Sequence, residues 1–147
     1  MTLRMALALA ALPLAAEADP DRVSILLGSH HINATRDFQE INPGVILTWQ
    51  QSALGYSLGA YYNSYEDISV LGALSYGVEI APEFELGVFG GLAWYPGEGD
   101  QFDHSIGDAV PLVGVQTRYR NAFVQLIPAD GGTLDGLVTF GLTFALD

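Results

Sequence analysis

Large apolar residues alternate with small or polar ones along most of this chain, in segments of about ten residues separated by turn residues. Leu54–Asn63 is a clear example, because alternate side chains of a strand point to opposite faces. One face of this segment carries Leu54, Tyr56, Leu58, Ala60 and Tyr62, and the other carries Gly55, Ser57, Gly59, Tyr61 and Asn63. A bulky apolar face opposite a small polar face is typical of a strand whose outer surface contacts lipid.

Seven other segments show the same kind of pattern, which makes an even total of eight. The predicted strands are Arg22–His31, Gly44–Gln50, Leu54–Asn63, Ile68–Ile80, Phe84–Tyr95, Ala109–Tyr119, Ala122–Ile127 and Gly136–Leu146. An even number of antiparallel strands closes a sheet with both termini on one side. The pattern therefore predicts an all-β fold, an eight-stranded antiparallel up-and-down transmembrane β-barrel, with residues 19–147 as its single domain.

The bulky face of each predicted strand is expected to face outward. In Gly136–Leu146 the outward residues would be Val138, Phe140, Leu142, Phe144 and Leu146. Aromatic residues near strand ends fit an interfacial belt: Trp49, Tyr56, Tyr62, Trp94 and Tyr119. Most connections alternate between short turns and long loops, as expected if the termini lie on the periplasmic side of an outer membrane.

Composition narrows the function classes. The chain has no cysteine and no lysine, and its formal net charge is −12. The charge argues against nucleic-acid binding, which depends on neutralising phosphates. No apolar run approaches the roughly 18 residues of a spanning helix, so any membrane embedding must use strands.

The N-terminus has the form of a secretory signal peptide. Arg4 supplies a positive charge, Met5–Ala15 is a short apolar stretch, and Ala16-Glu17-Ala18 matches the small-x-small cleavage pattern. We expect residues 1–18 to be removed and the mature chain to begin at Asp19.

Polar residues gather at the predicted outer ends of two strands. Ser29, His30 and His31 end the first strand, and Asn63 and Ser64 follow the third. An imidazole near a hydroxyl can activate it as a nucleophile or act as a general base toward an acceptor hydroxyl. The alternative is that these are ordinary polar rim residues.

Two groups of residues have side chains that could bind a metal ion. The histidine pair could bind an ion with Asp37, Glu40 or Glu66, but adjacent residues of a strand point to opposite faces. His104 lies in an acidic loop that could hold calcium or magnesium through oxygen ligands: Glu98, Asp100, Asp103 and Asp108. We expect neither site, and no cofactor.

Two prolines and several small residues bear on substrate access. Pro111 and Pro128 lie within or at the end of predicted strands and cannot donate to the ladder, so pairing should fail beside them. They mark either a gap in the wall or simple strand ends. Small inward residues, among them Gly59, Gly87 and Gly91, would leave a narrow cavity able to take one alkyl chain.

The order of these parts resembles the PagP-type lipid A palmitoyltransferases of the Gram-negative outer membrane. The segments that carry the resemblance are the run from Ser29 through Asn42-Pro43-Gly44, then Gly59–Tyr65, Val110-Pro111-Leu112 and Phe123–Pro128. In that family an eight-stranded barrel holds an acyl chain inside, proline-marked gaps admit it, and a His, an Asp and a Ser at the outer rim transfer palmitate from a phospholipid to lipid A.

The resemblance implies catalytic roles for His31 (or His30) and Ser64, with Asn63 at the position of the family aspartate. It also implies substrate contacts at Gly59, Tyr61, Gly87, Gly91, Pro111 and Pro128. Asparagine cannot carry the negative charge, so the aspartate role is lost or passes to Glu66 or Asp67. The family's N-terminal amphipathic helix has no counterpart, and the chain ends Leu146-Asp147 rather than in an aromatic residue.

The first function hypothesis is therefore acyl transfer from a phospholipid to lipid A or another outer-leaflet lipid. The expected partners are membrane phospholipid and lipopolysaccharide, and the expected state is a monomer in the outer membrane. The alternative is a non-enzymatic outer-membrane barrel that binds lipid or a partner through its acidic loops. A third reading, a soluble lipocalin-like binder, would need the bulky faces to turn inward.

Overall fold

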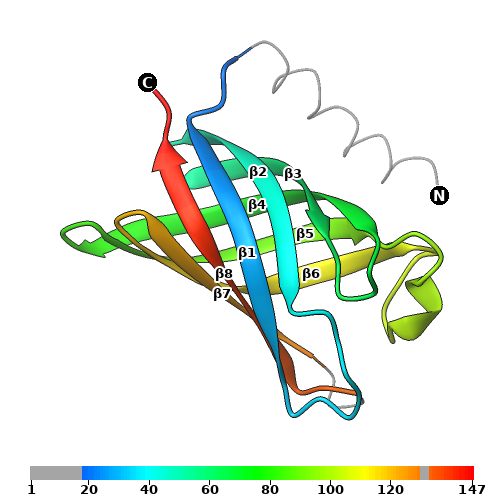
Figure 1. Cartoon of the computed structure of the whole chain (residues 1–147). Helices are drawn as coiled ribbons and strands as arrows, with labels where there is room; N and C mark the ends of the chain where they lie inside the picture. Colours follow the sequence, from blue (N-terminus) through cyan, green and yellow to red (C-terminus); the bar gives the residue numbers. More distant parts are fainter. Residues whose placement is uncertain (1–17, 130–132) are drawn as a thin grey trace.

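Eight strands form one closed antiparallel barrel in the part of the chain that the computed structural model describes, residues 18–129 and 133–147 (Figure 1). Each strand pairs with its neighbours in sequence, and β1 pairs with β8. The strands are β1 Arg22–Ile32, β2 Ile41–Gln51, β3 Leu54–Tyr62, β4 Ile68–Ala81, β5 Phe84–Trp94, β6 Ala109–Tyr119, β7 Ala122–Pro128 and β8 Gly136–Ala145. The predicted all-β, eight-stranded antiparallel architecture is confirmed.

The bulky face of the strands is outside, as the alternation predicts. Val70, Leu74 and Tyr76 of β4 are each more than half exposed, and Phe140, Leu142 and Phe144 of β8 are each 41% exposed. The intervening residues, such as Thr139 and Thr143, are buried. The barrel therefore presents an apolar outer band around an interior in which small and polar residues accompany a few apolar ones such as Leu26 and Phe89. The bulky faces do not turn inward, as a lipocalin-like core would need.

The two ends of the barrel differ. The β2–β3, β4–β5 and β6–β7 connections are tight turns at what we call the turn end, and each contains one residue with positive φ: Ser52, Glu83 and Arg120. The long connections meet at the opposite loop end. They include residues 33–40 and residues 95–108, the latter with the short 3₁₀ helix η1 (Gly99–Gln101). The start of β1 and the end of β8 both lie at the turn end (Figure 1).

β2 begins at Ile41, three residues earlier than predicted, and so includes Pro43. The proline is tolerated because β2 pairs with β3 only from Gly44 onward. A residue without an N–H leaves no ladder bond missing on an unpaired edge.

A β-bulge between Leu26 and Gly28 interrupts β1 against both of its neighbours. One extra residue reverses the alternation beyond it. Leu26 faces the interior and Leu27 is exposed, whereas past the bulge Ser29 and His31 are buried and His30 is exposed. Without the bulge, His30 rather than His31 would point inward.

The wall is incompletely paired between β6 and β7. These strands pair only from Val115–Tyr119 to Ala122–Leu126, so residues 109–114 have ladder partners only on β5. The two strands diverge toward the loop end in Figure 1. Pro111 and Pro128 both lie in the unpaired part, exposed on the outer face, and pairing fails beside each of them as predicted.

Within residues 18–129 and 133–147, no helix has the length and hydropathy needed to cross a bilayer. The signal-peptide prediction concerns residues 1–18, of which 1–17 lie outside the described residues.

Candidate functional site

An interior cavity of about 150 Å³ lies inside the barrel and reaches residues of both ends. Its turn-end lining includes Arg22, Glu85 and Arg118, and its loop-end lining includes Ser64 and Tyr95. Of the predicted substrate-contact residues, Tyr61 and Gly91 line the cavity. Gly59 and Gly87 are inward positions outside that lining, and the two prolines are on the outer face.

The inward glycines let neighbouring strands approach closely. A Cβ on Gly87 would lie 2.6 Å from the Tyr76 carbonyl oxygen, and one on Gly59 would lie 2.9 Å from the Val45 carbonyl oxygen. A Cβ on Gly91 would meet the Gly72 carbonyl oxygen and the Ala73 backbone. Such distances are shorter than carbon–oxygen contact allows, so these positions need glycine to shape the wall, whatever the cavity holds.

Aromatic side chains close over the loop end of the cavity. The Tyr61 hydroxyl donates a 2.8 Å hydrogen bond to the Tyr95 hydroxyl, and the Tyr95 ring packs 4.7 Å from Phe102 and 6.2 Å from Tyr65 between centroids. Tyr95 is buried, and burial raises its pKa well above the ordinary value, so its hydroxyl stays protonated. The cluster forms an apolar lid with neutral polar groups inside it.

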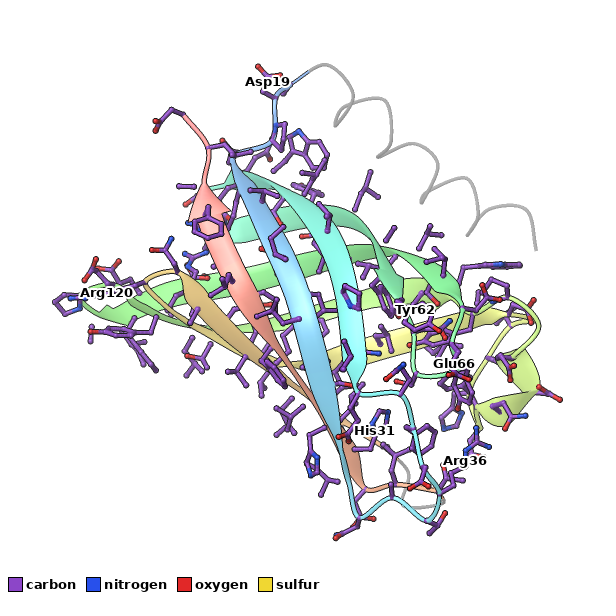
Figure 2. All side chains as sticks on the ribbon, in the orientation of Figure 1. Asp19, His31, Arg36, Tyr62, Glu66 and Arg120 are labelled. Carbon is purple, nitrogen blue, oxygen red and sulfur yellow. The ribbon has the colours of Figure 1, made fainter. Side chains whose placement is uncertain are left out.

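His31 is the inward histidine, and its ring is held on one face. The ring stacks on Phe38 with centroids 4.3 Å apart and planes 9° apart. Phe38 and Tyr65 in turn lie under the Arg36 guanidinium, at 4.9 and 5.2 Å. Figure 2 shows His31 and Arg36 at the loop end of the barrel.

Glu40, at the end of the β1–β2 loop, is the carboxylate beside His31. Its Oε1 accepts the His31 backbone N–H at 2.9 Å and lies 3.4 Å from His31 Nδ1 and 3.3 Å from His30 Nδ1. The hydrogen bond from the His31 backbone N–H lowers the pKa of the Glu40 carboxyl. If Nδ1–H donates to Glu40, Nε2 is left as the basic nitrogen.

Asn63 is a turn residue with every side-chain atom engaged. It is fully buried; Nδ2 donates to Ser69 Oγ at 2.9 Å, and Oδ1 accepts the backbone N–H groups of Tyr65 at 2.9 Å and Asp67 at 3.2 Å. These contacts stabilise the β3–β4 connection. They direct the amide toward its own turn, so Asn63 does not stand beside the His31 ring as a carboxylate partner would.

Ser64 occupies the boundary between two hollows. It lines the interior cavity and also an open groove at the loop end. The groove residues come from three connections: Arg36, Asp37, Phe38, Gln39, Ser64, Tyr65, Glu66, Glu98 and Gln101. The Ser64 carbonyl accepts the Gln39 N–H at 3.2 Å, which ties the β3–β4 connection to the β1–β2 loop.

The predicted site residues are therefore only partly brought together. His31 and Ser64 both belong to the loop end, but among the described residues no hydrogen bond joins their side chains. His30 points away from the interior, with its side chain 68% exposed.

Neither metal arrangement is formed: across residues 18–129 and 133–147, no group of three or more His, Cys, Asp or Glu side chains is placed to hold an ion. The Asp108 carboxylate instead accepts the backbone N–H groups of Gly97 and Gly99, at 3.0 and 3.2 Å. It therefore shapes its own loop.

Sequence reasoning placed Glu40 only among metal ligands and missed its contact with His31. It also did not single out Arg36, Phe38 or the aromatic lid. These residues lie in the connections between strands, where no two-residue period indicates which way a side chain points. The one available signal was the density of aromatic residues in the predicted loops.

A scan of protein-family models found none that matches this chain, and a search of curated proteins likewise found no match.

Proposed function

We propose that this protein is an outer-membrane acyltransferase that moves a fatty acyl chain from a phospholipid to lipid A or another outer-leaflet lipid. The observation that carries the proposal is the position of Ser64, which lines both the interior cavity and the loop-end groove. An acyl chain inside the barrel and an acceptor in the groove would place the reacting ester at this boundary.

The outer surface supports the membrane part of the proposal. Apolar residues of all eight strands are exposed on the barrel exterior. Contiguous exposed apolar surface of this extent would be costly in water and favourable in hydrocarbon. A closed ladder meanwhile satisfies the backbone groups, which a bilayer core requires.

The unpaired stretch between β6 and β7 supports lateral entry. Leu112 of β6 and Ile127 of β7 both line the cavity and lie where the two strands have lost their pairing. An acyl chain could pass from lipid into the interior here without breaking ladder hydrogen bonds. Pro111 and Pro128 lie in this stretch, and neither has an N–H to donate to a ladder bond across it.

The chemistry assigned to the loop end is general-base acyl transfer. His31 Nε2 would accept the proton of the acceptor hydroxyl as its oxygen attacks the ester carbonyl carbon. The new C–O bond forms, the bond to the glycerol oxygen breaks, and the imidazolium returns the proton to that oxygen. Glu40 would stabilise the imidazolium, and the Ser64 hydroxyl would donate to the carbonyl oxygen as its charge grows.

The alternative is a barrel of the same architecture that binds a lipid or a partner without catalysis. Two observations favour it: the His31 side chain is only 5% exposed, and Asn63 is occupied within its own turn. The loop-end groove, with Arg36 among Asp37, Glu66 and Glu98, would then be the binding surface.

Mass spectrometry of outer-membrane lipids from cells with and without the protein separates the two. Transfer predicts a gain of one acyl group that is lost in His31→Ala and Ser64→Ala. The matched controls are His104→Ala, on an exposed histidine of the β5–β6 loop, and Ser52→Ala, in a turn-end hairpin; both should keep the gain. An unchanged lipid profile, with folded protein recovered from the outer membrane, rejects transfer.

A further inference from the structure

The charged side chains that line the cavity gather at its turn end. Within the described lining they are Arg22, Glu85 and Arg118. Arg22 begins β1, Glu85 is the second residue of β5, and Arg118 is the second to last of β6. Two guanidinium groups face one carboxylate, so the interior carries one excess positive charge in a chain whose net charge is −12.

Arg118 and Glu85 satisfy each other. Arg118 Nη2 donates to Glu85 Oε2 at 2.6 Å, and both side chains are about one quarter exposed. This short charge-assisted bond makes Arg118 the direct partner of Glu85, while Glu85 acts on Arg22 only through space.

Arg22 supplies the excess charge. Its Nη1 donates to the neutral Thr143 hydroxyl at 3.2 Å, and that hydroxyl also accepts a 2.9 Å hydrogen bond from Ser24. None of the described carboxylates forms an ion pair with Arg22. A guanidinium has five N–H donors, and this one therefore has donors left for an anion inside the barrel.

The wall changes character away from Arg22. Near the turn end it is hydroxyl- and amide-rich, with Thr48 bonded to Ser57 at 2.8 Å. Farther along are apolar inward side chains: Leu26 and Phe89 in mid-strand, and Leu71 and Leu112 nearer the loop end. One cavity thus joins a cationic, polar end to a hydrocarbon-like middle.

We propose that this cavity binds a free long-chain fatty acid, with its carboxylate at Arg22 and its alkyl tail directed toward the loop end. A guanidinium can hold a carboxylate through two parallel hydrogen bonds. A methyl group against Arg22 would instead leave a cation facing hydrocarbon, which is unfavourable. The orientation is opposite to that of an acyl chain whose ester lies at Ser64, and it does not depend on acyl transfer.

The test uses the full barrel folded in deuterated micelles, with palmitate carrying ¹³C at the carboxyl carbon. Wild type should show a bound carboxyl resonance in NMR that acetate, which lacks the alkyl tail, fails to displace. Arg22→Gln should weaken binding by roughly tenfold or more, the usual loss for a charge-assisted hydrogen bond. Arg120→Gln removes an exposed turn-end arginine and should bind as wild type does. Arg22→Lys keeps the charge and should retain most of the affinity.

Orientation is read from stearate spin-labelled at carbon 5 or carbon 16. The carbon-5 label should broaden amide signals of Arg22, Ser24 and Thr143, and the carbon-16 label those of Tyr61 and Tyr95. Equal binding by Arg22→Gln, displacement by acetate or the reverse broadening pattern would each overturn the proposal. If Arg22→Gln does not fold, the broadening pattern and Arg22→Lys still decide. Loss of lipid acylation in His31→Ala bears only on the transferase proposal.

Discussion

Glu40 holds His31 at two points: one carboxylate oxygen accepts the backbone N–H at 2.9 Å and lies 3.4 Å from ring Nδ1. Phe38 covers the same ring by stacking, so its rotation is restricted on a second side. The family resemblance puts the aspartate position at Asn63, whereas the carboxylate that contacts His31 in the structure is Glu40 of the β1–β2 loop. If His31 is a general base, Glu40 is the residue that positions it.

Replacing Glu40 with glutamine tests that role. The side-chain oxygen can still accept the backbone N–H, but the negative charge that would stabilise the imidazolium is gone. We expect acyl transfer to fall by roughly 10- to 100-fold, less than the roughly 10²–10⁴-fold attributable to the base itself. Initial rates on a defined phospholipid and acceptor measure this, with Glu83→Gln, at an exposed carboxylate of the turn end, as the control. A Glu40→Gln rate equal to wild type would exclude Glu40 from the reaction.

The lowered pKa of Glu40 predicts a pH-dependent stability. A carboxyl whose pKa is lower in the folded state stabilises that state above the ordinary value of about 4.3, and this contribution is lost as pH falls through the lowered pKa. The effect is small because the Glu40 side chain is 45% exposed. In urea unfolding, the free energy of unfolding of wild type should therefore exceed that of Glu40→Gln at neutral pH. The difference should shrink as the pH is lowered into the acid range. A difference in unfolding free energy that stays constant down to the lowest pH would contradict the lowered pKa of Glu40.

Asn63 is predicted to stabilise its turn through hydrogen bonds. Asn63→Ala would leave buried partners at Ser69, Tyr65 and Asp67 without their acceptor or donor, at a cost of about 2 kcal/mol in the free energy of unfolding. Asn63→Asp keeps the acceptor for both N–H groups and allows Ser69 to reverse its role, so it should cost less at neutral pH. Equilibrium unfolding of the two variants decides. An increase of acyl transfer in Asn63→Asp would instead indicate a catalytic position.

Gly91 and its neighbour Gly90 allow a matched test of where the barrel wall requires glycine. An added methyl at Gly91 meets the β4 backbone, whereas at Gly90 the nearest heavy atom would be 3.9 Å away. Gly91→Ala should destabilise the barrel by about 1–3 kcal/mol through overpacking, and Gly90→Ala should change stability by no more than about 0.5 kcal/mol. Unfolding in lipid vesicles measures both. Equal effects would mean that the strands can move apart at Gly91 without cost.

The strand content and the outward faces could be read from the chain because side-chain direction in a strand has a period of two residues. The period holds along β4, β5 and β8, which lie with the predicted faces outward, and it is broken in β1 by the bulge. The failure of ladder hydrogen bonding at the prolines could also be predicted from the sequence, because a missing N–H is a property of the residue itself. The loss of β6–β7 pairing beside Pro111 and Pro128 agrees with this prediction, whereas the length of the unpaired stretch appears only in the structure.

The arrangement of polar residues at the loop end depends on contacts between residues far apart in the sequence, which no local pattern contains. The bulge after Leu26 moved His31 inward and His30 outward, and it arises from the fit of β1 against two neighbours at once. Glu40 reached His31 because a loop folded back over the rim, and Ser64 came to separate two hollows because three connections converge there. Strand periodicity describes neighbours along the chain, whereas these contacts join residues that only closure of the barrel brings together.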